Sequence, residues 1–283
     1  MTISGVLTAM VTPFDADGDL NEEASADLMR HLLENGSDGL VLAGSTGESV
    51  TLSDDEMDRL WKLGVAECGD ATVIAGTGSN DTRHAVHLTE LATEAGVDAV
   101  LVVAPYYNKP NQRGLKEHYR AVAAATDKPV ILYNIPSRSV IDMPNEFMAE
   151  LAAEIPNVSA VKQARFTELE PIEGLDLLAG NDDKFAETLD AGGTGGILVA
   201  SHLVGTEMRR MIDEPDARQE IHQSLSPLFE ALNVTTGPIP VKSAMAMLGH
   251  DVGGLRLPLV EASEEEKAVV RQALERHGLL AKV

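Results

Sequence analysis

The chain has 283 residues, 44% of them hydrophobic, so it can bury a large core and suits a single α/β barrel. Asp and Glu number 45 against 22 Lys and Arg, and the formal net charge of −23 argues against nucleic-acid partners and against docking on anionic membranes. The single cysteine, Cys68, excludes an internal disulfide framework, and the lack of a transmembrane-length apolar stretch and of a signal peptide predicts a soluble cytoplasmic protein.

Eight apolar runs recur along the chain, each rich in Val, Ile, Leu and Ala and each ending in Gly, Pro, Asn or polar residues. Continuous apolar runs of this kind are typical of strands buried on both faces of a sheet. We therefore expect eight parallel strands. The runs cover residues 5–14, 39–48, 71–78, 99–107, 129–135, 158–164, 175–181 and 195–201.

Amphipathic helical patterns lie between most of these runs. Residues 21–35 carry apolar side chains at four-residue steps, and Ser53 begins another helix with the capping-box partner Glu56. Residues 82–95 and 145–154 show the same pattern, and the last two intervals between strands are shorter but long enough for a crossover helix. Strand and helix repeated eight times predict a (β/α)8 TIM barrel, with a doubly wound open sheet as the alternative.

After residue 201 the strand pattern ends. Residues 208–212 and 222–232 are amphipathic, and Ser263 opens a final helix that we expect to end near Gly278. No low-complexity segment or long linker divides the chain. We therefore predict a barrel over residues 1–205 and an appended helical region over residues 206–283.

Polar residues stand where several apolar runs end, which in a barrel is the face that carries chemistry. One run ends in GSTGE (44–48), where the hydroxyls of Ser45 and Thr46 can bind a small carboxylate or simply belong to a turn. Two others end in PYYN (105–108) and YNIPSR (133–138), so three of the four tyrosines stand at strand ends. Each tyrosine alone could close the barrel mouth as packing, but together they indicate a site.

Lys162 stands inside the apolar run at 158–164. Lysine is almost never fully buried unless it is paired, so one interpretation is a buried ion pair or an amine that extends to solvent. The other is a catalytic amine, because burial disfavours the ammonium form and a neutral amine can attack a ketone to form a Schiff base. Tyr133 would stand on the neighbouring strand, within hydrogen-bond reach.

Other motifs are weak. The GTG at 76–78 lacks the third glycine of a dinucleotide fingerprint, and the chain has no phosphate-binding G-K-[ST]. GGTGG at 192–196 could hold an anion or make a tight turn. His84 and His87 share a helical face, where a surface pair is the simpler interpretation. We expect no metal site and no cofactor.

Five segments in chain order carry a resemblance to a known family. They are GSTGE (44–48), PYYNKP (105–110), YNIPSR (133–138), Lys162 and GPIPVK (237–242). These segments resemble the dihydrodipicolinate synthase / N-acetylneuraminate lyase family. The resemblance implies a (β/α)8 barrel with a C-terminal helical region, a homotetramer built as a dimer of dimers, and a reaction on pyruvate through a lysine Schiff base without a cofactor.

The resemblance also implies roles for individual residues. Lys162 looks like the Schiff-base lysine and Tyr133 like the proton shuttle. Ser45 and Tyr107 look like the rest of a hydroxyl relay, with Tyr107 expected to reach into the site of the neighbouring subunit. Thr46 is expected to bind the pyruvate carboxylate.

Arg138 indicates which reaction of the family is expected. In the synthases an arginine at this position holds the carboxylate of aspartate semialdehyde, which suits a bidentate guanidinium. The resemblance therefore implies condensation of pyruvate with aspartate semialdehyde, toward diaminopimelate and lysine. The alternative is a related aldolase that acts on a 2-keto-3-deoxy sugar acid or N-acetylneuraminate. Ile197, through its backbone carbonyl, and Gly180 match further positions that line the substrate site.

The sequence departs from the family pattern at three places. Ser45 stands where many synthases have threonine, which keeps the hydroxyl. KQARF (162–166) replaces the usual residues after the lysine, which leaves the shape of this loop open. Asp54, Met57 and His84 differ from the residues that lysine-inhibited synthases often carry, so we predict weak or absent inhibition by lysine.

Overall fold

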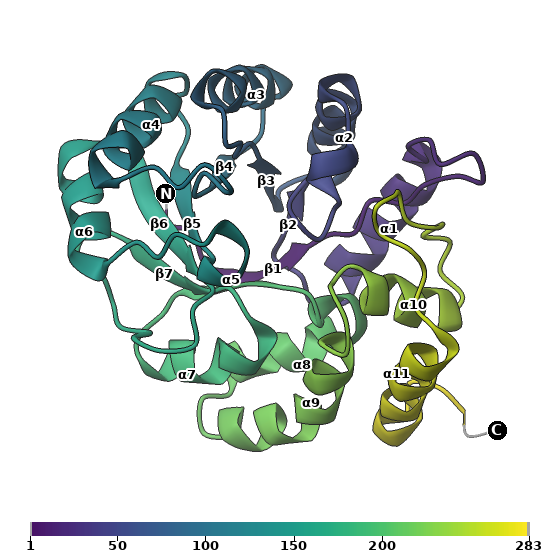
Figure 1. Ribbon diagram of the computed structural model, residues 1–283. Coiled ribbons are helices and arrows are strands. Elements are labelled where there is room, and N and C mark those ends of the chain that lie inside the picture. Colours follow the sequence, from purple (N-terminus) through teal and green to yellow (C-terminus); the bar gives the residue numbers. More distant parts are fainter. Residues whose placement is uncertain (1, 282–283) are drawn as a thin grey trace.

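The computed structural model describes residues 2–281, and its centre is a closed barrel of eight parallel strands in sequence order (Figure 1). The barrel confirms the predicted (β/α)8 fold and excludes the open sheet, because β1 pairs with both β2 and β8. Each strand lies within one of the eight apolar runs. The strands are Gly5–Ala9 (β1), Gly39–Leu42 (β2), Thr72–Gly76 (β3), Ala99–Val103 (β4), Val130–Asn134 (β5), Val158–Gln163 (β6), Asp176–Ala179 (β7) and Gly195–Leu198 (β8).

Helices on the outside of the barrel connect most of the strands (Figure 1). The Asn21 side chain accepts a hydrogen bond from the first turn of α1, and Ser53 and Glu56 form the predicted capping box of α2. The connecting helices are Glu22–Glu34 (α1), Asp54–Glu67 (α2), Thr82–Ala95 (α3), Gln112–Ala124 (α4), Pro136–Ser139 (α5), Asn145–Glu154 (α6) and Phe185–Asp190 (α7), with 3₁₀ turns at Ser49–Thr51 (η1) and Asp182–Lys184 (η2).

The connection from β6 to β7 differs from the expected crossover helix. Residues 164–175 form an irregular loop with one isolated bridge, between Ile172 and Leu175. Two residues disfavour a helix in this segment. Glu168 has a φ of 57°, in the left-handed region, and Pro171 has no backbone N–H donor. The two strands nevertheless pair directly in parallel.

Four helices follow the last strand: Ser201–Asp213 (α8), Arg218–Leu232 (α9), Ile239–Met247 (α10) and Glu264–His277 (α11). α8 packs on β1 as the eighth helix of the barrel, α9 and α10 pack on α8, and α11 packs on both α9 and α10. As predicted, α11 begins at the capping box of Ser263 and ends at Gly278, which has a left-handed conformation. The expected division of the chain between residues 205 and 206 lies inside α8.

Two layers of buried side chains support the barrel. One fills the barrel interior and includes Leu7, Ile74 and Ile197, and the other lies between the strands and the helices. Tyr133 belongs to the interior layer. Lys162 is its partner in the register of β5 and β6, so both side chains point to the same face of the sheet. The barrel therefore directs the buried lysine inward.

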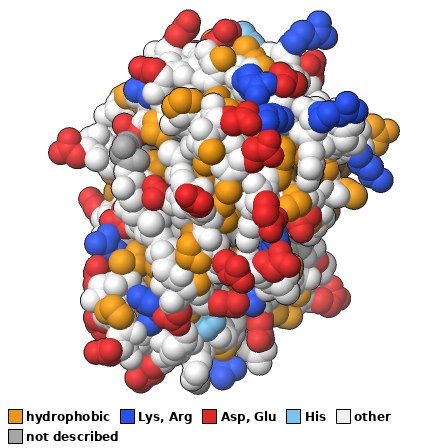
Figure 2. All heavy atoms as spheres, turned by 90° about the vertical axis from the view of Figure 1, so that its left-hand side faces the viewer, with side chains coloured by type: hydrophobic (Ala, Val, Ile, Leu, Met, Phe, Trp, Pro, Cys, Tyr) orange, Lys and Arg blue, Asp and Glu red, His pale blue; other side chains and the backbone are white. Residues whose placement is uncertain are grey.

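Acidic side chains are distributed over the outer surface. Figure 2 shows them spread across one face of the molecule rather than gathered in one patch. All 45 acidic residues lie within residues 2–281, and of these only Glu48 and Asp182 are buried, so nearly all of the negative charge lies at the surface. No helix within residues 2–281 is long and apolar enough to cross a membrane.

Candidate active site

A buried lysine and a tyrosine meet inside the barrel. Lys162 is 6% exposed, and its Nζ lies 4.3 Å from the centroid of the Tyr133 ring on the neighbouring strand. Among residues 2–281, the other buried lysine is Lys242, which pairs with Glu48, whereas no ion pair there includes Lys162. The geometry therefore argues against the buried ion pair that the sequence left open.

The loop after β2 brings two hydroxyls to the same place. Ser45, Thr46, Tyr133 and Lys162 line one small cavity at the C-terminal ends of the strands. A Cβ added to Gly76 at the end of β3 would lie 2.3 Å from a backbone oxygen of this loop. Only glycine allows this close approach. Four of the predicted site residues are therefore brought together by β2, β5 and β6.

A second cavity adjoins the first on its outer side. It shares Ser45 with the inner cavity and is lined further by Tyr106, Arg138 and Pro238. Arg138 lies exposed in α5, and its Nη2 donates a hydrogen bond to the carbonyl oxygen of Gly237 at 3.2 Å. The site thus has an inner part with an amine and hydroxyls and an outer part with a guanidinium, a group that suits a carboxylate.

The remaining predicted residues do not line either cavity in this chain. Tyr107 is 86% exposed, with a φ of 75°. Ile197 on β8 is fully buried inside the barrel. Gly180 follows β7 and donates its N–H to the carbonyl oxygen of Gln163 at 2.8 Å, where a Cβ would lie 2.7 Å from that of Ala164. Gly180 therefore lies beside the end of the strand that carries the lysine.

A buried carboxylate near the lysine was missed by the sequence analysis. Oδ1 of Asp182 accepts hydrogen bonds from the backbone N–H groups of Val199 at 2.9 Å and Ala200 at 3.0 Å. Burial raises the pKa of Asp182 to about 6, although these hydrogen bonds and the charge of Lys162 lower it. Its position just after β7 is the signal that could have identified it.

Arg165, also missed, determines the shape of the loop after β6. The side chain is 6% exposed, and its Nη2 donates a hydrogen bond to the carbonyl oxygen of Met143 at 2.7 Å. Its Nε lies 3.3 Å from a carboxylate oxygen of Asp142, and Glu168 pairs with the same guanidinium. The loop that carries Arg165 is therefore fastened to the segment between α5 and α6. Among residues 2–281, no group of three or more His, Cys, Asp or Glu could hold a metal ion.

Comparisons with known proteins show the family to which the chain belongs. The sequence model of the dihydrodipicolinate synthetase family matches residues 2–277. The chain is 46% identical over 288 residues to the 4-hydroxy-tetrahydrodipicolinate synthase of Desulforudis audaxviator, an alignment that covers 97% of this chain and 98% of that protein. It is 45% identical over 281 residues to the 4-hydroxy-tetrahydrodipicolinate synthase of Bacillus subtilis, with 94% and 97% covered.

A solved structure shows the same likeness. The dihydrodipicolinate synthase from Aquifex aeolicus superposes with a TM-score of 0.95 at 38% identity, and the match covers 99% of this chain and 100% of that one. Matches of this extent include the barrel, the loops at the ends of its strands and the C-terminal helices. The chain belongs to the dihydrodipicolinate synthetase family.

Proposed function

We propose that this chain catalyses the reaction of a 4-hydroxy-tetrahydrodipicolinate synthase, the condensation of pyruvate with L-aspartate 4-semialdehyde. The observation that carries the proposal is the position of Lys162, which is buried beside Tyr133 in a cavity shared with Ser45 and Thr46. A lysine amine in such a place is suited to covalent catalysis on a ketone. The proposed enzyme is a lyase of the Schiff-base, class I aldolase type.

The first step joins pyruvate to the enzyme. The neutral amine of Lys162 attacks the ketone carbon of pyruvate, and the carbinolamine loses water to form an imine. The hydroxyl of Thr46 and nearby backbone N–H groups bind the carboxylate. Tyr133 supplies and removes protons, and Ser45 is the next hydroxyl of the relay. The imine then draws electrons from the methyl group, which loses a proton to give an enamine.

The second step forms the carbon–carbon bond. The enamine carbon attacks the aldehyde of aspartate semialdehyde, whose carboxylate is held by Arg138 in the outer cavity. The oxygen of the aldehyde takes up a proton and becomes the hydroxyl of the product. The amine of this substrate then attacks the imine carbon and closes the ring, and the amine of Lys162 leaves. A guanidinium in the outer cavity favours this aldehyde over a neutral sugar chain.

We infer that the active form is a homotetramer in which Tyr107 contributes to the site of a neighbouring subunit. Tyr107 is 86% exposed and has a positive φ of 75°, an uncommon conformation for a residue other than glycine. An exposed aromatic ring held in this conformation suits a contact with a second copy of the chain. The cytoplasmic location predicted from the sequence stays a prediction.

Borohydride trapping tests the proposal. With pyruvate and sodium borohydride, the reduced imine should add one carboxyethyl group to the protein. Trypsin does not cleave after a modified lysine, so the label should appear in the peptide that extends from residue 139 to Arg165. Absence of this label, or a label on another lysine, would contradict the role of Lys162. Consumption of aspartate semialdehyde, compared with a 2-keto-3-deoxy sugar acid, then tests the reaction.

A further inference from the structure

A buried ion pair adjoins the loop with the two site hydroxyls. Glu48, at the end of the turn formed by residues 44–48, has a side chain that is 0% exposed. Its Oε1 lies 2.8 Å from Nζ of Lys242 on α10, which is 3% exposed. This contact is an ion pair at hydrogen-bond distance, and Nζ also donates a hydrogen bond to the carbonyl oxygen of Gly254 at 2.6 Å. Burial lowers the pKa of Lys242, although Glu48 raises it.

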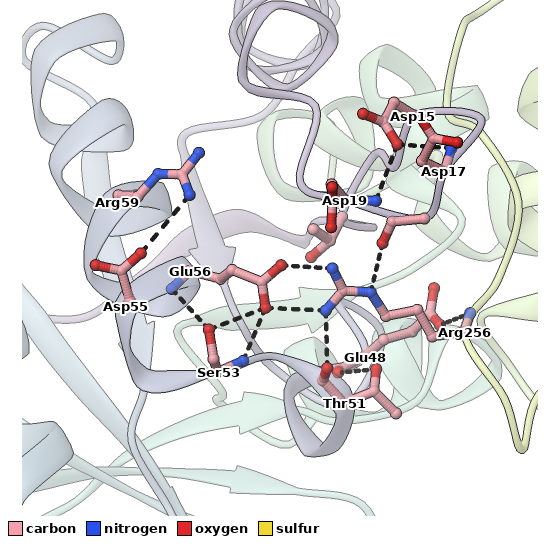
Figure 3. Close-up of polar contacts among 12 residues, drawn as sticks. Asp15, Asp17, Asp19, Glu48, Thr51, Ser53, Asp55, Glu56, Arg59 and Arg256 are labelled. Carbon is pink, nitrogen blue, oxygen red and sulfur yellow. Dashed lines mark hydrogen bonds and ion pairs between the residues drawn. The ribbon is translucent and has the colours of Figure 1, made fainter.

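Arg256, between α10 and α11, contacts Glu48 of the same turn and also Thr51 and Glu56 (Figure 3). Its backbone N–H donates to Oε2 of Glu48 at 3.0 Å, and its Nη1 donates to the carbonyl oxygen of Thr51 at 2.8 Å. Both Nη atoms contact the carboxylate of Glu56, at the start of α2. The C-terminal segment is therefore fastened to both ends of the connection from residues 44–48 to α2.

The ring of Phe14 makes a cation–π contact with both Lys242 and Arg256. Nζ of Lys242 and Cζ of Arg256 each lie 4.3 Å from the centroid of the Phe14 ring, a cation–π distance. Together with Glu48 and Glu56 they form a charge cluster of two cations and two anions. Loss of one member of a buried pair leaves an uncompensated charge, which is strongly unfavourable. The cluster therefore holds its members in one arrangement.

Glu48 also has an unusual backbone conformation in the turn at residues 44–48. Glu48 has a φ of 57°, a left-handed conformation that is unfavourable for a residue with a Cβ. Its N–H donates to the carbonyl oxygen of Ser45 at 3.3 Å, and its carbonyl oxygen accepts from the N–H of Thr51 at 2.9 Å. A strained residue persists only where its surroundings determine it. The contacts of the Glu48 side chain thus also hold the turn that presents the hydroxyls.

We propose that Lys242, through its ion pair with Glu48, is a positioning residue that holds the turn at residues 44–48 in the geometry that binds the pyruvate carboxylate, with Arg256 as the second anchor. The inference rests on the proposed function. Because a displacement of about 1 Å can cost 10²-fold in activity, a loosened turn should weaken pyruvate binding by about tenfold or more. The reacting amine comes from β6, outside the cluster, so the imine should still form at saturating pyruvate.

The test is a titration of borohydride trapping with the variant Lys242→Met, which keeps most of the side-chain volume and removes the charge. Labelling of the intact protein is measured against pyruvate concentration by mass spectrometry. We expect the half-saturating concentration to rise about tenfold or more and labelling at saturation to stay complete. The matched control is Lys267→Met, because the carboxylates that Lys267 on α11 contacts are exposed, such as Glu264 at 3.1 Å. Its half-saturating concentration should equal that of the unmodified protein.

Glu48→Gln provides a second variant in case Lys242→Met does not fold, which a thermal unfolding curve shows. It keeps an acceptor for the N–H of Arg256 and should also raise the half-saturating pyruvate concentration. An unchanged half-saturating pyruvate concentration in a folded variant would overturn the inference. A fall in labelling at saturation together with a rise in that concentration would also overturn it, because such a fall indicates general structural damage. If the unmodified protein is labelled, either of these results in the variants contradicts only this inference and not the proposed function. If the unmodified protein itself is not labelled, the proposed function fails and this inference with it.

Discussion

Replacement of Glu56 by glutamine should show how strongly the contact with Arg256 stabilises the fold. Nη1 of Arg256 lies 2.9 Å from Oε2 of Glu56, and the two side chains are 18% and 15% exposed. A glutamine at the third position of the helix still completes a capping box with Ser53. Glu56→Gln therefore removes the charge of the carboxylate and leaves the start of α2 intact.

The pKa of Glu56 sets the size of the effect and its dependence on pH. The hydrogen bonds from Arg256 are the largest cause that lowers this pKa from 4.5 to about 2. Since one pKa unit corresponds to about 1.4 kcal/mol, the charge contributes up to about 3 kcal/mol to the free energy of unfolding. A lowered pKa stabilises the protein above pH 4.5, and the contribution is lost as the pH falls toward 2. We expect Glu56→Gln to unfold more easily at pH 7, with a smaller difference in acid.

Urea denaturation followed by circular dichroism, at pH 7 and at pH 3, measures both quantities. The control is Glu22→Gln, which removes an exposed ion pair between α1 and Arg59 of α2, with Nε and Oε1 2.6 Å apart. Exposed pairs contribute little, so this variant should match the unmodified protein. Equal stability of Glu56→Gln and the unmodified protein at pH 7 would refute the reasoning. A difference that stays the same at both pH values would refute its electrostatic basis.

Three further outcomes follow from the site. Tyr133→Phe should lower kcat by about 10²- to 10⁴-fold in a steady-state assay, since it removes a proton-transfer group, and an unchanged kcat would contradict that role. Arg138→Ala should raise the KM for aspartate semialdehyde by about tenfold or more and leave the KM for pyruvate unchanged, whereas an equal rise in both would contradict its place in the outer cavity. Millimolar lysine should inhibit the purified enzyme weakly or not at all, because Asp54, Met57 and His84 differ from the residues that lysine-inhibited synthases often carry, and a halved rate would disprove this.

Features that depend on neighbouring residues in the chain were predictable from the sequence. Apolar runs located the eight strands, and the capping boxes at Ser53 and Ser263 located the starts of two helices. Lys162 was recognisable because a charged residue inside an apolar strand is exceptional. The rule that chemistry lies at the C-terminal ends of barrel strands then led to Ser45, Thr46 and Tyr133, which line the same cavity.

Features that depend on distant pairings were not predictable in the same way. Arg256 and Glu48 are 208 residues apart, and nothing in either local sequence indicates that they meet. Arg165 appeared only as a departure from a family pattern, because its partners lie in the segment between α5 and α6. The crossover helix was expected there from the length of the interval alone, but the conformation of the loop at 164–175 follows from such distant contacts.

The arrangement of charge explains how so acidic a chain can accept the two carboxylate substrates that we propose. The two buried acidic side chains are compensated locally, Glu48 by Lys242 and by the N–H of Arg256, and Asp182 by two backbone N–H groups. The other acidic groups lie in contact with water, where salt largely screens charges that are more than about 10 Å apart at ordinary ionic strength. Glu48 lines the same outer cavity as Arg138, but Lys242 compensates its charge, so the guanidinium remains available to a substrate carboxylate. Net charge thus argues against an extended polyanion as a partner, but a few groups at the ends of the barrel strands decide whether a small anion binds.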